Sequence, residues 1–216
     1  MNLVITSYCH LHDNRVIVND KLVFYQENIL KFADFIKTVY KQEQITYPKF
    51  YKMDSIGKLG FLAAEIVFKE RSIEGYNPGK VGVVLSNSSS SLDTDIVFND
   101  SIKDRSGYFP SPSVFVYTLP NIVIGEICIK NGIKGENAFF ISESFNGKQL
   151  LTYVNELFEN NRVDACLCGW VEIMGSQYHS LMILVEKESA GNAETLPVAK
   201  RRLFNEENLS LLMIRN

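Results

Sequence analysis

The 216-residue chain lacks long hydrophobic runs, blocks of like charge and a basic excess. Its 22 Lys and Arg against 25 Asp and Glu leave a net charge of −3, which offers no basic surface to nucleic acid. No apolar run approaches the ~18 residues of a membrane span. The first residues, MNLVITSYCHLHDN, lack the basic segment and the cleavage site of a signal peptide. We therefore expect a cytoplasmic protein that binds neither a membrane nor nucleic acid.

Cysteine and histidine are scarce, and neither is spaced as in common metal sites. Cys166 and Cys168 would share a strand face but have no zinc-type CxxC spacing, so we interpret them as buried, reduced thiols. His10 and His12 also share a strand face, yet no acidic or thiol partner recurs at ligand spacing. We favour two polar residues where a strand leaves the sheet, and place His179 at a turn. The sequence indicates no metal and no cofactor.

The apolar residues are patterned as in a single α/β domain spanning residues 1–216. Their share of 46% is enough for a full core. Strand-like runs lie at 2–7, 81–85, 137–142, 163–174 and 179–189, and 14–26 alternates as in a hairpin. Helical patterns lie at 27–42, 144–159 and in the tail 194–216. A further helix should begin after a cap at Asp54 or Ser55. Another lies within 114–132, where Pro120 either starts its main part or kinks it. This alternation predicts a layered fold with a mixed sheet.

Four stretches carry the sequence pattern of a known enzyme family. KMDSIGKLGFLAAEIVF resembles R-M-D-x-x-x-x-L-x-x-A-A-x-x-A, and VGVVLSNSSSS stands where the family has a strand ending in G-x-x-x-G-T. PSVFVYTLPNIVIGEICIKNGIKGENAFFISES resembles a long motif that ends in T-A-C, and VDACLCGWVEI resembles D-x-x-x-x-G-G-x-E. The positions in register are Asn121, Gly125, Gly132, Gly135, Gly147, Asp164, Gly169 and Glu172. The chain thus resembles the N-terminal half of the β-ketoacyl-acyl-carrier-protein synthases, in the thiolase-like superfamily.

This resemblance implies a fold and an activity to compare with the residues present. The implied fold is a thiolase-like half-fold, with one mixed five-stranded sheet and helices packed mainly on one face. The implied activity is an acyltransferase of fatty acid or polyketide biosynthesis. The family's two catalytic histidines and its supporting lysine lie in its C-terminal half, which the resemblance does not cover.

The family's catalytic cysteine, in T-A-C-x-x-G, corresponds to Ser144 in the stretch SESFNG at 142–147. A helix N-terminus activates a cysteine by lowering its pKa, whereas a serine needs a nearby base. Glu143 would also repel a developing oxyanion. Ser142, Glu143 and Phe145 would be the substrate-binding positions. We therefore expect a catalytically degenerate site, and favour Ser144 as a helix N-cap over Ser144 as a nucleophile.

The helix expected at 144–159 gives an independent indication. In two-unit family members the corresponding helix is apolar or small on all sides, because it is sandwiched between two sheets. Here one side is polar, and burying its charges would be costly; it carries Lys148, Gln149, Thr152, Asn155 and Glu156. We therefore expect a single α/β layer.

The leading hypothesis is a non-catalytic synthase-like subunit or scaffold, for example in an aryl-polyene-type pathway. The expected partners are a full-length ketosynthase, an acyl carrier protein or a second copy of the chain. From the resemblance, we expect a dimer formed through strand 163–174. The basic cluster AKRRL at 199–203 either meets an acidic carrier protein or, as we favour, is a solvated helix face.

Two other functions stay open. The first is an acyltransferase that uses Ser144 with a base supplied by a partner. The second is an acyl-chain binding module, which requires a deep pocket beside Ser144 lined by Phe139, Ile141 and Phe145.

Overall fold

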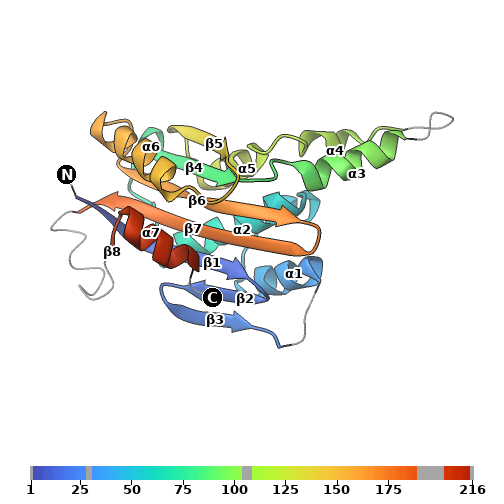
Figure 1. The fold of residues 1–216 in the computed structure, drawn as a ribbon, viewed down its shortest axis with the longest axis horizontal. Coiled ribbons are helices and arrows are strands. Elements are labelled where there is room, and N and C mark those ends of the chain that lie inside the picture. Colours follow the sequence, from blue (N-terminus) through green and yellow to red (C-terminus); the bar gives the residue numbers. More distant parts are fainter. Residues whose placement is uncertain (1, 28–30, 104–108, 189–201, 215–216) are drawn as a thin grey trace.

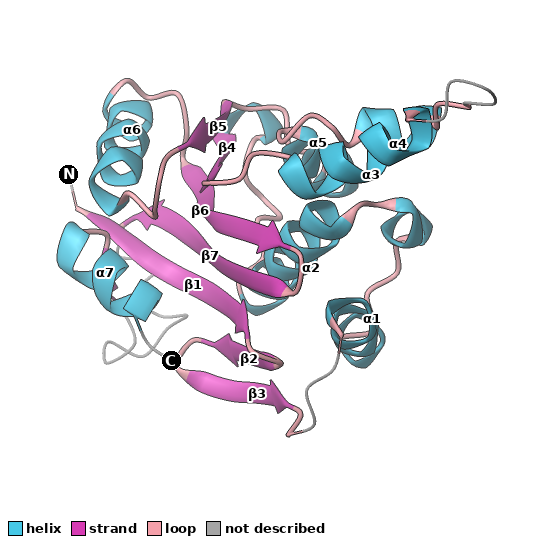
Figure 2. Ribbon diagram, turned by 45° about the vertical axis from the view of Figure 1, so that its right-hand side comes forward, coloured by secondary structure: helices cyan, strands magenta, loops and turns pink. Residues whose placement is uncertain are grey.

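The structure is a computed structural model that describes residues 2–27, 31–103, 109–188 and 202–214. One sheet runs through the molecule and helices lie on both of its faces (Figures 1 and 2). The strands are β1 (Leu3–His12), β2 (Arg15–Val18), β3 (Lys21–Tyr25), β4 (Val81–Asn87), β5 (Asn137–Ile141), β6 (Ala165–Met174), β7 (Gln177–Lys187) and β8 (Arg202–Leu203). The α-helices are α1 (Phe32–Gln42), α2 (Ser55–Glu70), α3 (Leu92–Ile102), α4 (Pro112–Val116), α5 (Ile122–Asn131), α6 (Gly147–Glu159) and α7 (Glu206–Ile214).

The order of the strands confirms an α/β fold with one mixed sheet. It is β3-β2-β1-β7-β6-β4-β5, and β8 pairs with β1. β4 is parallel to β5 and to β6, whereas the other pairs are antiparallel. The described sheet has eight strands rather than the expected five, because the β2–β3 hairpin and the short β8 add to it.

The sheet carries an apolar core on each face. The larger core packs α1, α2 and α5 against one face, with Phe61, Leu62 and Ile127 fully buried. The smaller core packs α6 and α7 against the other face, around Val154 and Leu209. Figure 2 shows these two sets of helices on opposite sides of the sheet. The helices are thus concentrated on one face, as expected, while α6 and α7 cover part of the second.

Local sequence signals explain where several helices begin and end. Asp54 caps α2, since its side chain accepts a hydrogen bond of 2.9 Å from the Gly57 amide. The helix expected within 114–132 is divided into α4 and α5, and α5 begins two residues after Pro120. Gly132 ends α5 in the left-handed conformation, with φ of 67°. No helix in the described part of the chain is long and apolar enough to cross a membrane.

The tail differs from the helix with a short apolar end that is expected at 194–216. Residues 189–201 lie outside the described residues, and with them most of the 199–203 cluster. Arg202 and Leu203 form β8 rather than a helix face, and the Arg202 side chain pairs with Asp20 at 2.6 Å. The strand pairing arises because β1 offers a partner at Val4 and Ile5, a long-range contact that a local pattern does not reveal.

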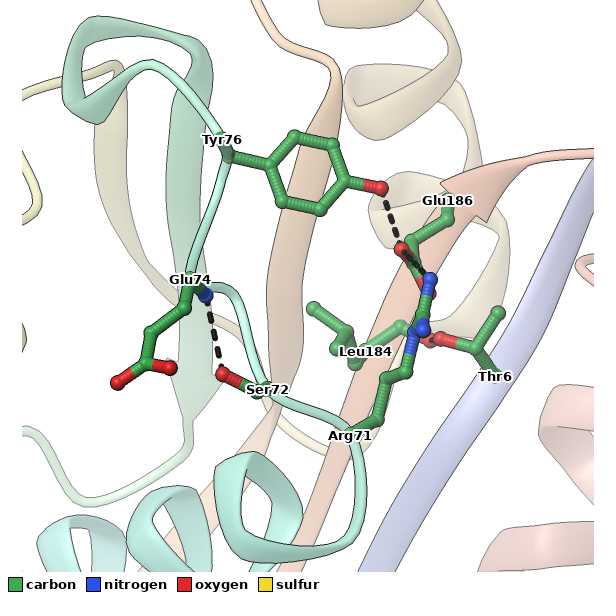
Figure 3. Close-up of polar contacts among 7 residues, drawn as sticks. All are labelled: Thr6, Arg71, Ser72, Glu74, Tyr76, Leu184 and Glu186. Carbon is green, nitrogen blue, oxygen red and sulfur yellow. Dashed lines mark hydrogen bonds and ion pairs between the residues drawn. The ribbon is translucent and has the colours of Figure 1, made fainter. Parts of the chain in front are cut away.

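A buried ion pair fastens the C-terminal end of β7 to the end of α2 (Figure 3). The Glu186 carboxylate is completely buried and accepts two hydrogen bonds of 2.9 Å from the Arg71 guanidinium. The Tyr76 hydroxyl donates a third hydrogen bond to it. Burial alone would raise the pKa of Glu186, but the hydrogen bonds outweigh burial and lower it. This carboxylate therefore stays ionised in the folded chain.

We predict that Arg71→Ala lowers the free energy of unfolding by about 3–5 kcal/mol, because it leaves a buried carboxylate without its cation. Urea denaturation at pH 7 measures the change. Arg162→Ala is the control, since its pair with Glu136 is largely exposed and should cost no more than about 1 kcal/mol. Equal decreases in the free energy of unfolding of the two variants would contradict the buried ion pair between Arg71 and Glu186.

A second prediction concerns Gly169, at the centre of the sheet. A Cβ there would lie 1.9 Å from the Leu181 carbonyl oxygen, which β7 holds in place. Gly169→Ala should therefore destabilise the fold by at least about 1–3 kcal/mol. Gly125→Ala, within α5 and with no atom within 4 Å of the new Cβ, should instead stabilise it by up to about 1 kcal/mol. Thermal unfolding measures both variants: the melting temperature should fall for Gly169→Ala and rise for Gly125→Ala.

Candidate functional site

The turn from β5 into α6 is the candidate site that the sequence singled out. β5 ends at Ile141, and the Ser142 amide still donates to the Asn87 carbonyl at 2.9 Å. The Ser142 hydroxyl donates to the Ser144 carbonyl at 3.0 Å. The N-cap of α6 is Asn146, whose side chain accepts from the Gln149 amide at 2.9 Å. The expectation that Ser144 caps the helix is therefore wrong, because α6 begins at Gly147.

Ser144 and Glu143 are both exposed in this turn. A serine nucleophile needs a base within about 2.6–3.2 Å of its hydroxyl. Within the described residues, no hydrogen bond involves the Ser144 hydroxyl and no histidine contacts it. The Ser144 hydroxyl is therefore exposed to solvent, and no described residue is placed to activate it as a nucleophile.

Phe145 fastens the turn to the sheet. Its ring meets the Trp170 ring edge-on, with the centroids 6.1 Å apart. Phe145 belongs to the smaller core, whereas Phe139 packs into the larger core on the opposite face, and Ile141 is half-exposed. The pocket that an acyl-chain binding module requires is therefore not formed by these three residues, because Phe139 and Ile141 share one face of β5, whereas Phe145 follows the strand and packs on the opposite face of the sheet. A hollow of about 430 Å³ beside α6 is lined instead by Phe140, Asn146, Lys148, Gln149, Thr152, Tyr153 and Glu156.

The polar side of α6 is as the sequence indicates. Lys148, Thr152 and Glu156 are exposed, while Leu150, Val154, Leu157 and Phe158 face the sheet.

A serine-rich loop lies at the same edge of the sheet, after β4. The Glu172 carboxylate on β6 accepts hydrogen bonds from the Ser88 amide at 2.6 Å, the Ser88 hydroxyl at 2.7 Å and the Ser89 amide at 3.2 Å. From the sequence, Glu172 is known only as one of the positions that match the motif D-x-x-x-x-G-G-x-E. Its contacts show that it fixes this loop, whose amide donors are thereby occupied.

Sequence reasoning missed the gathering of all three histidines, which we call the histidine cluster (His10, His12 and His179). His12 lies directly opposite His179 on neighbouring strands, and the Nε2 atoms of His10 and His179 are in contact. The ring centroids of His10 lie 4.3 Å from His12 and 4.6 Å from His179. His12 does end β1, as expected, but His10 lies within it, and His179 lies inside β7 rather than at the Gly175–Ser176 turn.

Burial keeps two of these imidazoles neutral. Burial, together with the neighbouring His179 and His12, lowers the pKa of His10 to about 3. Burial and the neighbouring His12, opposed by Asp13, lower the pKa of His179 to about 4. No group of three or more His, Cys, Asp or Glu in the described part of the chain is arranged to hold a metal ion.

The four cysteines are free thiols, which confirms the reading of Cys166 and Cys168 as buried and reduced. Both lie in the smaller core, and burial raises the pKa of each thiol well above its usual range. Neither is a reactive thiolate in the folded chain.

The strand expected to form a dimer is not available for pairing. β6, within 163–174, is hydrogen-bonded to β4 on one side and to β7 on the other. The expectation of a dimer through this strand is therefore wrong. Its continuous apolar make-up reflects burial on both faces in the centre of the sheet. The last strand on this side of the described sheet is β5.

Comparison with solved structures relates this fold to a group of enzymes and their partners. No family model and no curated protein matches the chain. The ishigamide ketosynthase/chain length factor superposes with a TM-score of 0.66 at 16% identity, over 88% of this chain and 63% of that one. A chain of the AntDE:AntF complex, a type II polyketide ketosynthase with its acyl-carrier protein, gives 0.62 at 15% identity, over 87% and 62%.

A third complex contains a chain that is closer in length to the present one. It is the ketosynthase ApeO with its chain length factor ApeC from Xenorhabdus doucetiae, with a TM-score of 0.57 at 12% identity. The match covers 88% of this chain and 81% of the matched chain. The present chain thus spans about three fifths of the first two neighbours and most of the third. These likenesses establish that the chain has the fold of ketosynthases and chain length factors.

Proposed function

We propose that the chain is a non-catalytic ketosynthase-like subunit that pairs with a full-length ketosynthase of fatty acid or polyketide biosynthesis. The observation that carries the proposal is the outer edge of β5, which pairs with no other strand of the described sheet and runs into a turn where no described residue acts as a base for Ser144. The structural neighbours support it, since they include ketosynthases with a chain length factor and a ketosynthase with its acyl-carrier protein. In this view an acyl carrier protein binds the assembled pair.

The edge of β5 offers backbone groups for an added strand. The Val83 amide donates to the Glu136 carbonyl and the Ser142 amide donates to the Asn87 carbonyl, so these groups point toward β4. Alternation along a strand then directs the amides of Phe139 and Ile141 away from β4. An unpaired row of this kind is a template for pairing with another chain.

Exposed apolar side chains flank this edge. α4, α5 and β5 lie along the same border of the molecule in both views (Figures 1 and 2). Apolar residues on these elements are exposed by 59% for Phe115, 64% for Ile129 and 51% for Ile141, and Leu119, between α4 and α5, is exposed by 56%. Apolar groups gathered at one border indicate a protein-binding surface, which adds buried area to the strand pairing.

We predict that Ile141→Pro abolishes the complex with a full-length ketosynthase from the same pathway, because proline removes an outward-facing amide while leaving the bonds to β4. Ile141→Thr, which keeps the amide, is the control and should retain the complex. Co-purification and light scattering measure both. A complex that survives Ile141→Pro contradicts pairing through this edge, and a stable homodimer that excludes the ketosynthase contradicts the heterodimer.

The alternative function is an acyltransferase that uses Ser144 with a base from the partner. The exposure of the hydroxyl is the observation that favours it. We expect no acyl group on Ser144 after incubation with an acyl carrier thioester, with or without the ketosynthase. Intact mass spectrometry tests this, and a Ser144 adduct that disappears in Ser144→Ala would favour the acyltransferase instead.

A further inference from the structure

The histidine cluster is a polar site built into an apolar part of the sheet. His10 and His12 are only 2% and 5% exposed, and they lie on the same face as Tyr8 and Leu181 of the smaller core. The contact between His10 and His179 joins residues 169 positions apart, at the end of the β1–β7 ladder. Nothing in the proposed function uses these side chains, so their role requires a separate account.

Two facing Nε2 atoms can be held together only when one of them carries a proton and the other offers its lone pair. If both nitrogens carry a proton, two N–H groups oppose each other between the buried His10 ring and the half-buried His179 ring. The His12 Nε2 atom is buried and has no partner among the described residues, so it does not relieve that conflict through a hydrogen bond.

The charged and titratable groups around the cluster would do little to stabilise a second proton on the two facing Nε2 atoms. The Asp13 carboxylate contacts the His12 Nδ1 atom at 3.1 Å, but it is 83% exposed. Glu172 lies opposite His179 on β6, but its carboxylate is hydrogen-bonded to Ser88 and Ser89. The remaining neighbours in the sheet are Arg15, which lies opposite His12 on β2, and Tyr8, which is covered by Arg202.

We propose that the His10–His179 contact is an acid-sensitive latch, which closes this end of the β1–β7 ladder at neutral pH and releases it on acidification. Release frees the start of β7, which lies beside Trp170 and therefore beside the turn that carries Phe145. The latch depends on the tautomers of two imidazoles, on the burial of His10 and on the partial burial of His179, and it requires no partner chain.

The direction of the pH effect follows from proton linkage. In an opened segment both histidines regain their ordinary pKa of 6.5, whereas in the closed form the pKa is about 3 for His10 and about 4 for His179. The open form thus binds more protons below pH 6.5, so the latch contributes its full stability above that pH and loses it as the pH falls. Each histidine should raise the open population by up to about tenfold per pH unit in this range.

The opposite end of β7 provides an internal reference. There Glu186 is paired with Arg71, and its pKa is lowered, so this end keeps its charges throughout the range from pH 6.5 to 5.0. Asp54 and Glu65 have pKa values raised by burial, and their protonation would favour the folded form rather than the open one. Loosening confined to one end of β7 therefore identifies the histidines.

The test is native-state hydrogen exchange on the full chain at pH 6.5, 5.75 and 5.0, corrected for intrinsic exchange rates. At His10, Leu11, Ser180 and Leu181 we expect the open population to rise by up to about 100-fold per pH unit, with much smaller changes at Val185 and Glu186. His10→Gln should leave about a tenfold dependence, and His10→Gln with His179→Gln should leave none. Ser180→Ala, a change at the same place that keeps both imidazoles, should retain the full dependence.

A second measurement does not rely on variants. Imidazole nitrogen NMR at pH 7.5 should show one protonated and one unprotonated Nε2 atom for His10 and His179. Two protonated or two unprotonated Nε2 atoms would overturn the proposal. A pH-independent open population at the cluster in the unmodified chain would overturn it as well.

Discussion

The rest of the structure depends on one constraint: the central sheet is apolar on both faces, and both must be covered. β4, β6 and most of β7 are buried on either side, as expected of strands in the middle of a layered fold. α2 and α5 cover one face, and α6 with α7 cover part of the other. The apolar side of α6 is buried against the sheet, so its polar side remains exposed.

The same constraint determines which strand has an outward-facing edge, and so where the proposed partner would bind. With β6 and β7 enclosed in the sheet, β5 is the strand on the α4–α5 side whose backbone edge faces outward. The turn after β5 carries Ser144, whereas the imidazoles of the chain lie on β1 and β7, on the far side of β4 and β6. At about 4.8 Å between strands, they are too far across the sheet to act on a group at the end of β5. This separation supports the proposal that the chain acts through contact with a partner.

The sequence predicted the fold class and most elements, because buried strands and amphipathic helices leave local patterns. The cap at Asp54 and the break near Pro120 were also visible, since both are properties of a few adjacent residues. Long-range features were not visible. A continuous apolar run does not tell a central strand from an edge, so 163–174 was misplaced, and no local signal connects His179 to a strand that begins at Leu3. At the turn, Ser144 and Asn146 are both good caps, and the path of the chain decides between them.

The most direct test of the central claim is product formation by the ketosynthase pair with altered forms of this chain. The account predicts that Ser144→Ala supports the same rate and product length as the unmodified chain, because the subunit acts through its surface. A Ser144→Ala chain that still forms the complex but yields no product would contradict the account, since the hydroxyl would then take part in the chemistry.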